Sequence, residues 1–291
     1  MKVKSLLIAS LVAFSSLNAA SLIDEAKNSG LVALPKDQKG VDEILKQNGV
    51  KASEFTLEKA ELGKKLYFEP RLSKSGIISC NTCHNVGLGG TDGISTAIGH
   101  KWTANPHHLN SPTVYNAVLN NTQFWDGRAG TLADQAKGPI QADPEMATPA
   151  KLAVEKISSL PEYVSEFKKI YGKSGVNFDN IADAIANFER TLITPSRFDK
   201  FLEGDEKALT KEEQKGLKLF IDKGCVACHN GVIWNLKDAI KEMGSVQLGI
   251  KISDKEAKSI ETFLKSLTGT KPAIVYPQLP ISTEKTPKPE L

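Results

Sequence analysis

The stretch Ile78–His84 reads I-S-C-N-T-C-H and contains the five-residue pattern Cys-x-x-Cys-His. Cys80 and Cys83 stand one helical turn apart and His84 follows directly, which is the spacing that covalent attachment of a c-type haem requires. The two thiols can add to the two vinyl groups of one porphyrin, and the adjacent imidazole can then bind the iron from one side. This stretch therefore predicts a covalently bound haem c.

The same pattern returns at Cys225, Cys228 and His229. The two copies use all four cysteines of the chain, so none remains for a disulfide. A redox dithiol of the thioredoxin type would need a βαβ setting, which neither copy has. A zinc site of four cysteines would explain the thiols but not the histidine after each pair. The sequence thus predicts two haem c groups in one chain.

Residues 1–20 have the layout of a cleavable secretory signal peptide. Lys2 and Lys4 precede the apolar run Leu6–Phe14, and small residues follow up to Ala20. The run is too short to span a bilayer, so an uncleaved anchor is the weaker alternative and no membrane span is expected after processing. Since cytochrome c maturation takes place outside the cytoplasm, this signal and the haem motifs predict the same destination.

The charge balance argues against a nucleic-acid partner. The formal net charge of +3 falls to +1 when the signal peptide leaves with its two lysines. The remaining charges are scattered along the chain and form no basic stripe.

The rest of the chain predicts a mainly α protein of two cytochrome c-like haem domains. Similar helical segments precede the two haem motifs, at Leu62–Phe68 and Lys215–Phe220. After each motif comes a segment whose apolar residues recur at i, i+3 and i+7 and so share a helical face. These residues are Ile185, Phe188 and Leu192 in the first unit, and Ile260, Phe263 and Leu267 in the second. The expected domains span residues 21–200 and 201–270.

A Pro-rich tail is expected over residues 271–291. Its five prolines favour an extended strap or a loose end over a helix; they are Pro272, Pro277, Pro280, Pro287 and Pro289. The apolar segment Ala273–Tyr276 is expected to pack on the body, and the last ten residues are expected to stay free of it.

The first unit is far larger than an electron carrier needs. Roughly 100 residues separate His84 from Ile181, and they begin with the glycine-rich loop Gly87–Gly93. The motifs that follow are I-G-H at His100, N-S-P-T-V from Asn110, F-W-D-G-R around Trp125, and G-P-I-Q after Gln135. So many polar and aromatic residues indicate an added binding or catalytic pocket.

Taken together, these motifs and S-C-N-T-C-H-N resemble the bacterial dihaem cytochrome c peroxidases, a periplasmic family. The likeness runs from Leu62 to Met146 and continues through Cys225 to the tail. It implies a periplasmic oxidoreductase that reduces hydrogen peroxide to water with electrons from a small c-type cytochrome or a similar donor. The alternatives are a non-enzymatic dihaem electron-transfer protein, an impaired peroxidase, and a haem-dependent oxidase of protein side chains.

The resemblance also implies the ligands of the two haem irons. His84 matches the proximal ligand of the peroxidatic haem, and His100 matches the distal histidine that leaves the iron on activation. His229 matches the proximal ligand of the electron-transferring haem, with Met243 as its distal ligand. Taken without the resemblance, His100 is as easily a surface histidine, and Met243 a core methionine.

Further roles follow from the same resemblance. Gln135 and Glu145 match the polar pair where peroxide binds, and Glu145 is the expected catalytic base. Trp125 matches the aromatic residue between the two haems, and Asn110 matches a ligand of a calcium ion between the domains. The ordinary alternatives are a solvated carboxylate for Glu145, a core aromatic for Trp125 and a turn residue for Asn110.

The second unit departs from the family pattern. Relative to the family, about 60 residues are absent between Gly231 and Val232. In the family that segment supplies two calcium ligands and part of the dimer surface. Calcium binding therefore stays open, because Ca²⁺ needs six to eight oxygens. Formation of a homodimer stays open as well. A shortened domain would also admit water to its haem, which is the basis for the alternative of an impaired peroxidase.

Overall fold

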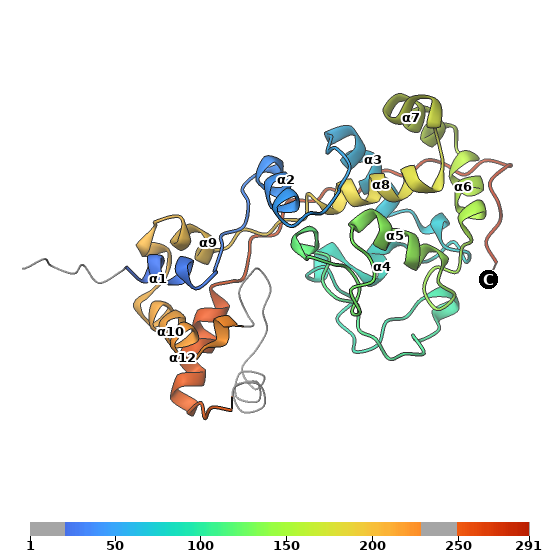
Figure 1. Ribbon diagram of the computed structural model, residues 1–291. Helices are drawn as coiled ribbons and strands as arrows, with labels where there is room; N and C mark the ends of the chain where they lie inside the picture. Colours follow the sequence, from blue (N-terminus) through green and yellow to red (C-terminus); the bar gives the residue numbers. More distant parts are fainter. Residues whose placement is uncertain (1–20, 228–248, 291) are drawn as a thin grey trace, which may run out of the picture.

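The computed structural model describes residues 21–227 and 249–290, which form two groups of helices joined by extended segments (Figure 1). Across these residues the chain is mainly helical and has no strand, as the sequence predicts. Two isolated β-bridges join Ile98 to Ala104 and Gln123 to Ala129. None of the described helices is both long enough and apolar enough to cross a bilayer.

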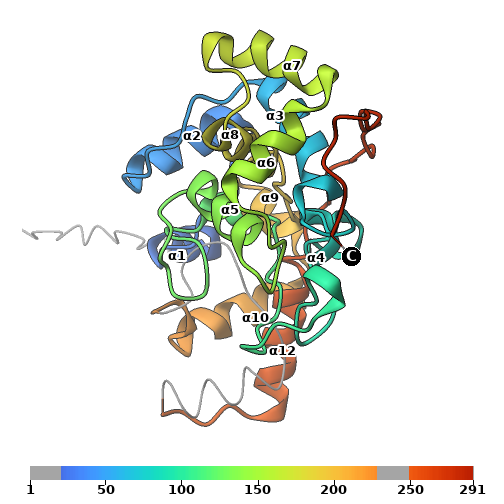
Figure 2. The same ribbon diagram turned by 90° about the vertical axis from the view of Figure 1, so that its right-hand side faces the viewer.

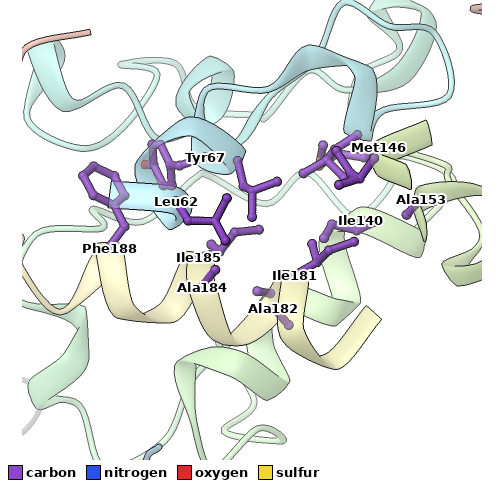
Figure 3. Close-up of a cluster of buried hydrophobic side chains, with 14 of the residues drawn as sticks. Leu62, Tyr67, Ile140, Met146, Ala153, Ile181, Ala182, Ala184, Ile185 and Phe188 are labelled. Carbon is purple, nitrogen blue, oxygen red and sulfur yellow. The ribbon is translucent and has the colours of Figure 1, made fainter. Parts of the chain in front are cut away.

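The first group is built around α3 (Leu57–Tyr67) and α8 (Phe178–Glu189). Both helices begin at a capping residue: the side chain of Thr56 accepts from the Lys59 N–H, and that of Asn177 from the Asn180 N–H. Their apolar faces are buried in one cluster (Figure 3). The buried face predicted for this segment is confirmed at Ile185 and Phe188, which are buried in α8. Leu192 is also buried, but it lies after the end of the helix.

Further helices complete the first group. They are α2 (Gln38–Gln47), α4 (Cys80–Cys83), α5 (Leu132–Gln141), α6 (Ala150–Ser158) and α7 (Pro161–Tyr171). α5 and α6 both contact α8, and α2 contacts the short turn Ala117–Leu119. Short 3₁₀ turns, at Pro70–Leu72, Val86–Leu88 and His100–Trp102 among others, carry the chain around the haem motif.

The second group repeats the central helix pair of the first. α10 (Lys211–Asp222) packs against α12 (Asp254–Lys265), as α3 packs against α8. In both pairs a glycine faces a backbone carbonyl of the partner helix: Gly63 faces Ala184, and Gly216 faces Ser259. The repeat inferred from similar sequences before each haem motif is therefore a repeated helix crossing.

The N-terminal helix packs with the second group of helices, and the predicted domain ranges stay predictions. α1 (Leu22–Asn28) lies against α9 (Arg197–Leu202) and α10, and its Ile23 and Ala26 are buried in the second cluster. Phe198, inside the range expected for the first domain, also belongs to that cluster. A seven-residue helix carries too short an apolar pattern to indicate which unit it joins.

The tail is extended, but the expectation that its last ten residues stay free of the body is wrong. The guanidinium of Arg71 donates to the Ser282 hydroxyl and the Pro280 carbonyl, at 3.0 and 2.9 Å. The Thr283 hydroxyl donates to the Ser159 carbonyl at 3.0 Å, and Lys74 pairs with Glu290 at 2.9 Å. The tail thus leaves α12 and ends on the first group (Figures 1 and 2). Polar side chains fix it, so apolar patterning gave no sign of this contact.

The two glycine crossings lead to a stability prediction. A Cβ added at Gly63 would lie 1.8 Å from the Ala184 carbonyl oxygen, and one at Gly216 would lie 2.0 Å from that of Ser259. Alanine is a better helix former than glycine. Even so, the free energy of unfolding of each Gly→Ala variant should be lower by about 1–3 kcal/mol, because the backbones of the two crossing helices must move apart. Urea unfolding followed by circular dichroism measures this.

Gly138→Ala in α5 is the matched control, because its added Cβ would meet only the movable Phe124 ring. Equal stability of Gly63→Ala and the wild type would contradict the close crossing.

Candidate haem site

The first haem motif lies in the wall of a cavity of about 470 Å³ in the first group of helices. Cys80, Cys83 and His84 line this cavity. So do four residues given roles from the sequence, namely Asn110, Trp125, Gln135 and Glu145. The structure therefore brings together residues that lie 65 positions apart in the chain, since Cys80 and Glu145 line the same cavity.

His84 is oriented by contacts on both its ring and its backbone. Nδ1 lies 2.8 Å from the Pro112 carbonyl oxygen, which leaves Nε2 as the nitrogen for a metal. The Tyr67 hydroxyl donates to the His84 carbonyl at 2.6 Å, which ties the motif to the end of α3. Burial lowers the pKa of the imidazole, so the ring is kept neutral, as a metal ligand must be.

The two thiols of the motif are free and neutral. Burial raises the pKa of Cys80, and it raises the pKa of Cys83 to about 11. Neither forms a disulfide. Two thiols and one imidazole on one wall of an apolar cavity are the donor set that a covalently attached haem c needs, so the residues present fit that group.

α5 and the loop after it also line the cavity. Thr131 caps the helix by accepting from the Asp134 N–H at 3.0 Å, and Gln135 then faces the cavity one turn later. Glu145 follows in the loop, where its N–H donates to the Ala142 carbonyl at 2.9 Å. Burial raises the pKa of Glu145, and the Arg128 guanidinium partly opposes this. A carboxylate with a raised pKa is a suitable general base.

The I-G-H motif supports this loop directly. A Cβ at Gly99 would lie 2.1 Å from the Pro144 carbonyl oxygen, so only glycine allows the two segments to touch. The His100 N–H donates to the Glu145 carbonyl at 2.6 Å. Local sequence patterns could not indicate this contact, because the two motifs are 45 residues apart.

The side chain of His100 is not among the residues that line the cavity. Its Nδ1 is buried with no hydrogen-bond partner among the described residues. Burial lowers its pKa, as do the neighbouring cations Lys101 and Lys74, and Glu290 of the tail acts in the opposite direction. Iron ligation by His100 stays a prediction.

Trp125 and Asn110 both line the cavity and contact each other. Trp125 is 68% exposed, so it is not a core aromatic, and its indole N–H donates to the Asn110 carbonyl at 3.3 Å. The Asn110 amide nitrogen in turn donates to the Ile94 carbonyl at 2.5 Å. No group of three His, Cys, Asp or Glu side chains is placed to hold a metal ion within residues 21–227 and 249–290, and calcium at Asn110 stays a prediction.

The second haem motif is described only at its start. Cys225 opens a 3₁₀ turn, Cys225–Ala227, after α10. Cys228, His229 and Met243 lie outside the described residues, as does the junction of Gly231 and Val232. Their predicted roles as haem attachment and iron ligands therefore stay predictions.

Sequence reasoning missed one residue of the first cavity. Glu189, the last residue of α8, lines the cavity and is only 7% exposed. The available sequence signal was that Glu189 is a charged residue in an otherwise apolar helical stripe. Glutamate is seldom buried without a partner, which made the position easy to pass over.

A helical body that holds Cys-x-x-Cys-His in the wall of an apolar cavity defines a c-type haem protein. Comparison with known proteins makes the class more specific. The sequence profile of the family described as di-haem cytochrome c peroxidase matches residues 57–207. The chain is 43% identical to cytochrome c551 peroxidase of Pseudomonas aeruginosa, over 80% of this chain and 85% of that protein. The chain therefore belongs to the bacterial dihaem cytochrome c peroxidases, a family of haem oxidoreductases.

Other relatives agree with this assignment. Cytochrome c551 peroxidase of Nitrosomonas europaea is 42% identical, over 79% of this chain and 85% of that protein. A solved MauG-like protein associated with microbial copper homeostasis is 28% identical and superposes with a TM-score of 0.56. The match covers 61% of this chain and 53% of that one, so this chain spans about half the length of the solved relative.

The alignment with the Pseudomonas aeruginosa protein also contains a gap. It runs over 295 residues but includes only 80% of this 291-residue chain, which is about 233 residues. About 60 positions of the alignment thus have no residue from this chain. This is the size of the segment expected to be absent after Gly231, and its place in the second unit stays a prediction.

Covalent haem can be counted directly. The purified, denatured protein should carry the mass of two haem groups, and the variant with both Cys80→Ser and Cys83→Ser should carry one, because a porphyrin without a thioether dissociates on denaturation. Mass spectrometry and a pyridine haemochrome assay measure this.

The matched variant replaces Cys225 and Cys228 and should also lose one haem. A wild-type chain with the mass of the bare polypeptide would refute haem attachment.

Proposed function

We propose that this protein is a periplasmic peroxidase that reduces hydrogen peroxide to water with electrons from a small c-type cytochrome or a similar donor. The observation that carries the proposal is that Glu145 and Gln135 line the same cavity as Cys80, Cys83 and His84. The relatives named cytochrome c551 peroxidase support both the substrate and a cytochrome as donor. An exported c-type haem protein of this family belongs in the periplasm.

The chain's own residues can perform the proton chemistry. When bound, the haem would supply a redox-active iron that passes two electrons from the donor to peroxide. The Glu145 carboxylate would take a proton from one oxygen of the peroxide and return it to the other oxygen, which leaves as water. The Gln135 amide donates a hydrogen bond to the bound oxygens. Two protons and two electrons then convert one peroxide molecule into two water molecules.

The remaining roles are part of the same proposal. His84 would hold the haem iron, and the release of His100 from that iron would make room for peroxide. Trp125 would aid electron transfer from the second haem to the first, as an aromatic side chain can. His229 and Met243 ligate the second haem, calcium binds at Asn110, and two chains associate as a homodimer.

A second candidate function is a dihaem electron carrier without catalysis. The gap of about 60 positions in the alignment favours it, because a shortened second unit would cover its haem poorly. Steady turnover of peroxide with a reduced cytochrome separates the two candidates, since a carrier shows none.

Glu145 provides the main test of the enzymatic proposal. Glu145→Gln removes the base but keeps the shape, so kcat for peroxide should fall about 10²–10⁴-fold with haem content unchanged. The base must be deprotonated to act, and burial raises the pKa of Glu145 above the usual 4.5. Wild-type kcat should therefore decline on the acid side at a pH above 4.5. Stopped-flow and steady-state assays across pH measure both.

Asp143→Asn is the control, because Asp143 is an exposed neighbour that does not line the cavity. Unchanged turnover in Glu145→Gln would remove Glu145 from the mechanism.

The ligands of the second haem can be tested by its potential. A thioether opposite an imidazole raises the potential of a haem, so two well-separated potentials are expected, one of them high. Met243→His should lower only the higher one in a spectroelectrochemical titration. Met146→Leu, a volume-conserving change near the first haem motif, should leave the higher potential in place. Two low potentials in the wild type would contradict the His229 and Met243 pair.

A further inference from the structure

Glu189 is a buried acid whose position in the cavity serves none of the proposed steps. It ends α8, one turn after Ile185, and both residues line the cavity that contains Cys80 and Cys83. Its side chain is almost fully enclosed, and Oε2 has no hydrogen-bond partner among the described residues. A buried polar oxygen without a partner is uncommon in folded proteins and calls for an explanation.

The groups that face Glu189 do not neutralise a negative charge. The Tyr67 phenol at the end of α3 and the Cys80 thiol of α4 are its electrostatic neighbours, and its charge contributes to raising the pKa of both. From α5, Gln135 adds only an amide to the cavity wall. The next residue, Arg190, uses its guanidinium elsewhere, donating to the Ser53 carbonyl at 2.9 Å and pairing with Asp42.

The protonated form of this side chain is therefore favoured over the carboxylate. Moving an unpaired carboxylate out of water costs several kcal/mol, whereas a neutral acid loses much less. Burial raises the pKa of Glu189 to about 8. The acid thus changes its protonation within the range of pH in which a periplasmic protein works.

An adjacent redox centre would be coupled to that proton. A haem attached to Cys80 and Cys83 gains one negative charge when it is reduced. Charges interact strongly across an apolar cavity. A negative haem makes a neighbouring carboxylate less favourable and its protonated form more favourable. Since Glu189 and Cys80 interact electrostatically within the described structure, a porphyrin bound to Cys80 lies within reach of this effect.

We propose that Glu189 binds a proton when the haem attached to Cys80 and Cys83 is reduced, and releases it when that haem is oxidised. In this step the iron gains one electron from the donor, the Glu189 carboxylate gains one proton from water, and the O–H bond of the carboxylic acid is formed. The inference requires the first haem but not peroxide turnover. It adds to the proposed function a store for one of the two protons that peroxide reduction consumes.

Linkage makes the inference measurable, because a proton that binds on reduction makes the potential depend on pH. In spectroelectrochemical titrations of the holoprotein between pH 6 and 9.5, one haem potential should fall as pH rises. The slope should approach, at most, about 59 mV per pH unit, the value for a tenfold change in a one-electron couple. Glu189→Gln should flatten this slope, with haem content and circular dichroism unchanged.

Glu162→Gln is the matched control, because Glu162 is an exposed residue of α7, outside the cavity. It should keep the wild-type slope. A slope that persists in Glu189→Gln would overturn the proposal and assign the proton to another group, such as a haem propionate.

A second measurement uses the wild type alone, in case Glu189→Gln fails to fold. The reduced-minus-oxidised infrared difference spectrum should show a carbonyl band of a buried protonated carboxyl that grows on reduction. Its absence would reject the inference. If the wild type shows the pH-dependent potential and the infrared band but does not turn over peroxide, the proposed function is rejected. The proton-binding role of Glu189 is then retained.

Discussion

The close crossing of α3 and α8 at Gly63 is the contact on which the first haem site depends. Because the glycine has no side chain, α3 approaches the Ala184 carbonyl of α8 directly. This approach places Tyr67, the last residue of α3, where its hydroxyl holds the His84 carbonyl. It also fixes α8, whose end carries Glu189 into the cavity wall. One backbone contact thus positions both His84 and the buried acid Glu189.

The tail joins the two helical groups by a second, polar route. It leaves α12 of the second group and is held on the first by Arg71, Ser159 and Lys74. Arg71 is itself fixed by an ion pair with Glu69, which is fully buried and also accepts from the Tyr163 hydroxyl. A buried, fully partnered network of this kind gives the extended tail one defined path across the surface.

Much of the fold and part of the site could be predicted because their signals are local. The i, i+3 spacing of Ile185 and Phe188 specifies one helical face, and both residues are buried in α8. The contact of Gly99 with Pro144 and the path of the tail could not be predicted, since both join segments far apart in sequence through backbone or polar contacts. The same holds for α1, whose short apolar face gives no indication of its partner.

The sequence by itself determined where haem can be attached, because two thiols and an imidazole at fixed spacing form one reactive unit wherever the fold puts them. It also determined the helical class of the protein and, through combined motifs, its family. Only the tertiary structure decided which carboxyl groups line the cavity with that motif and which of them are buried from solvent. The physical reason is that the pKa of Glu145 and Glu189 depends on burial, and burial results from the packing of distant helices and loops.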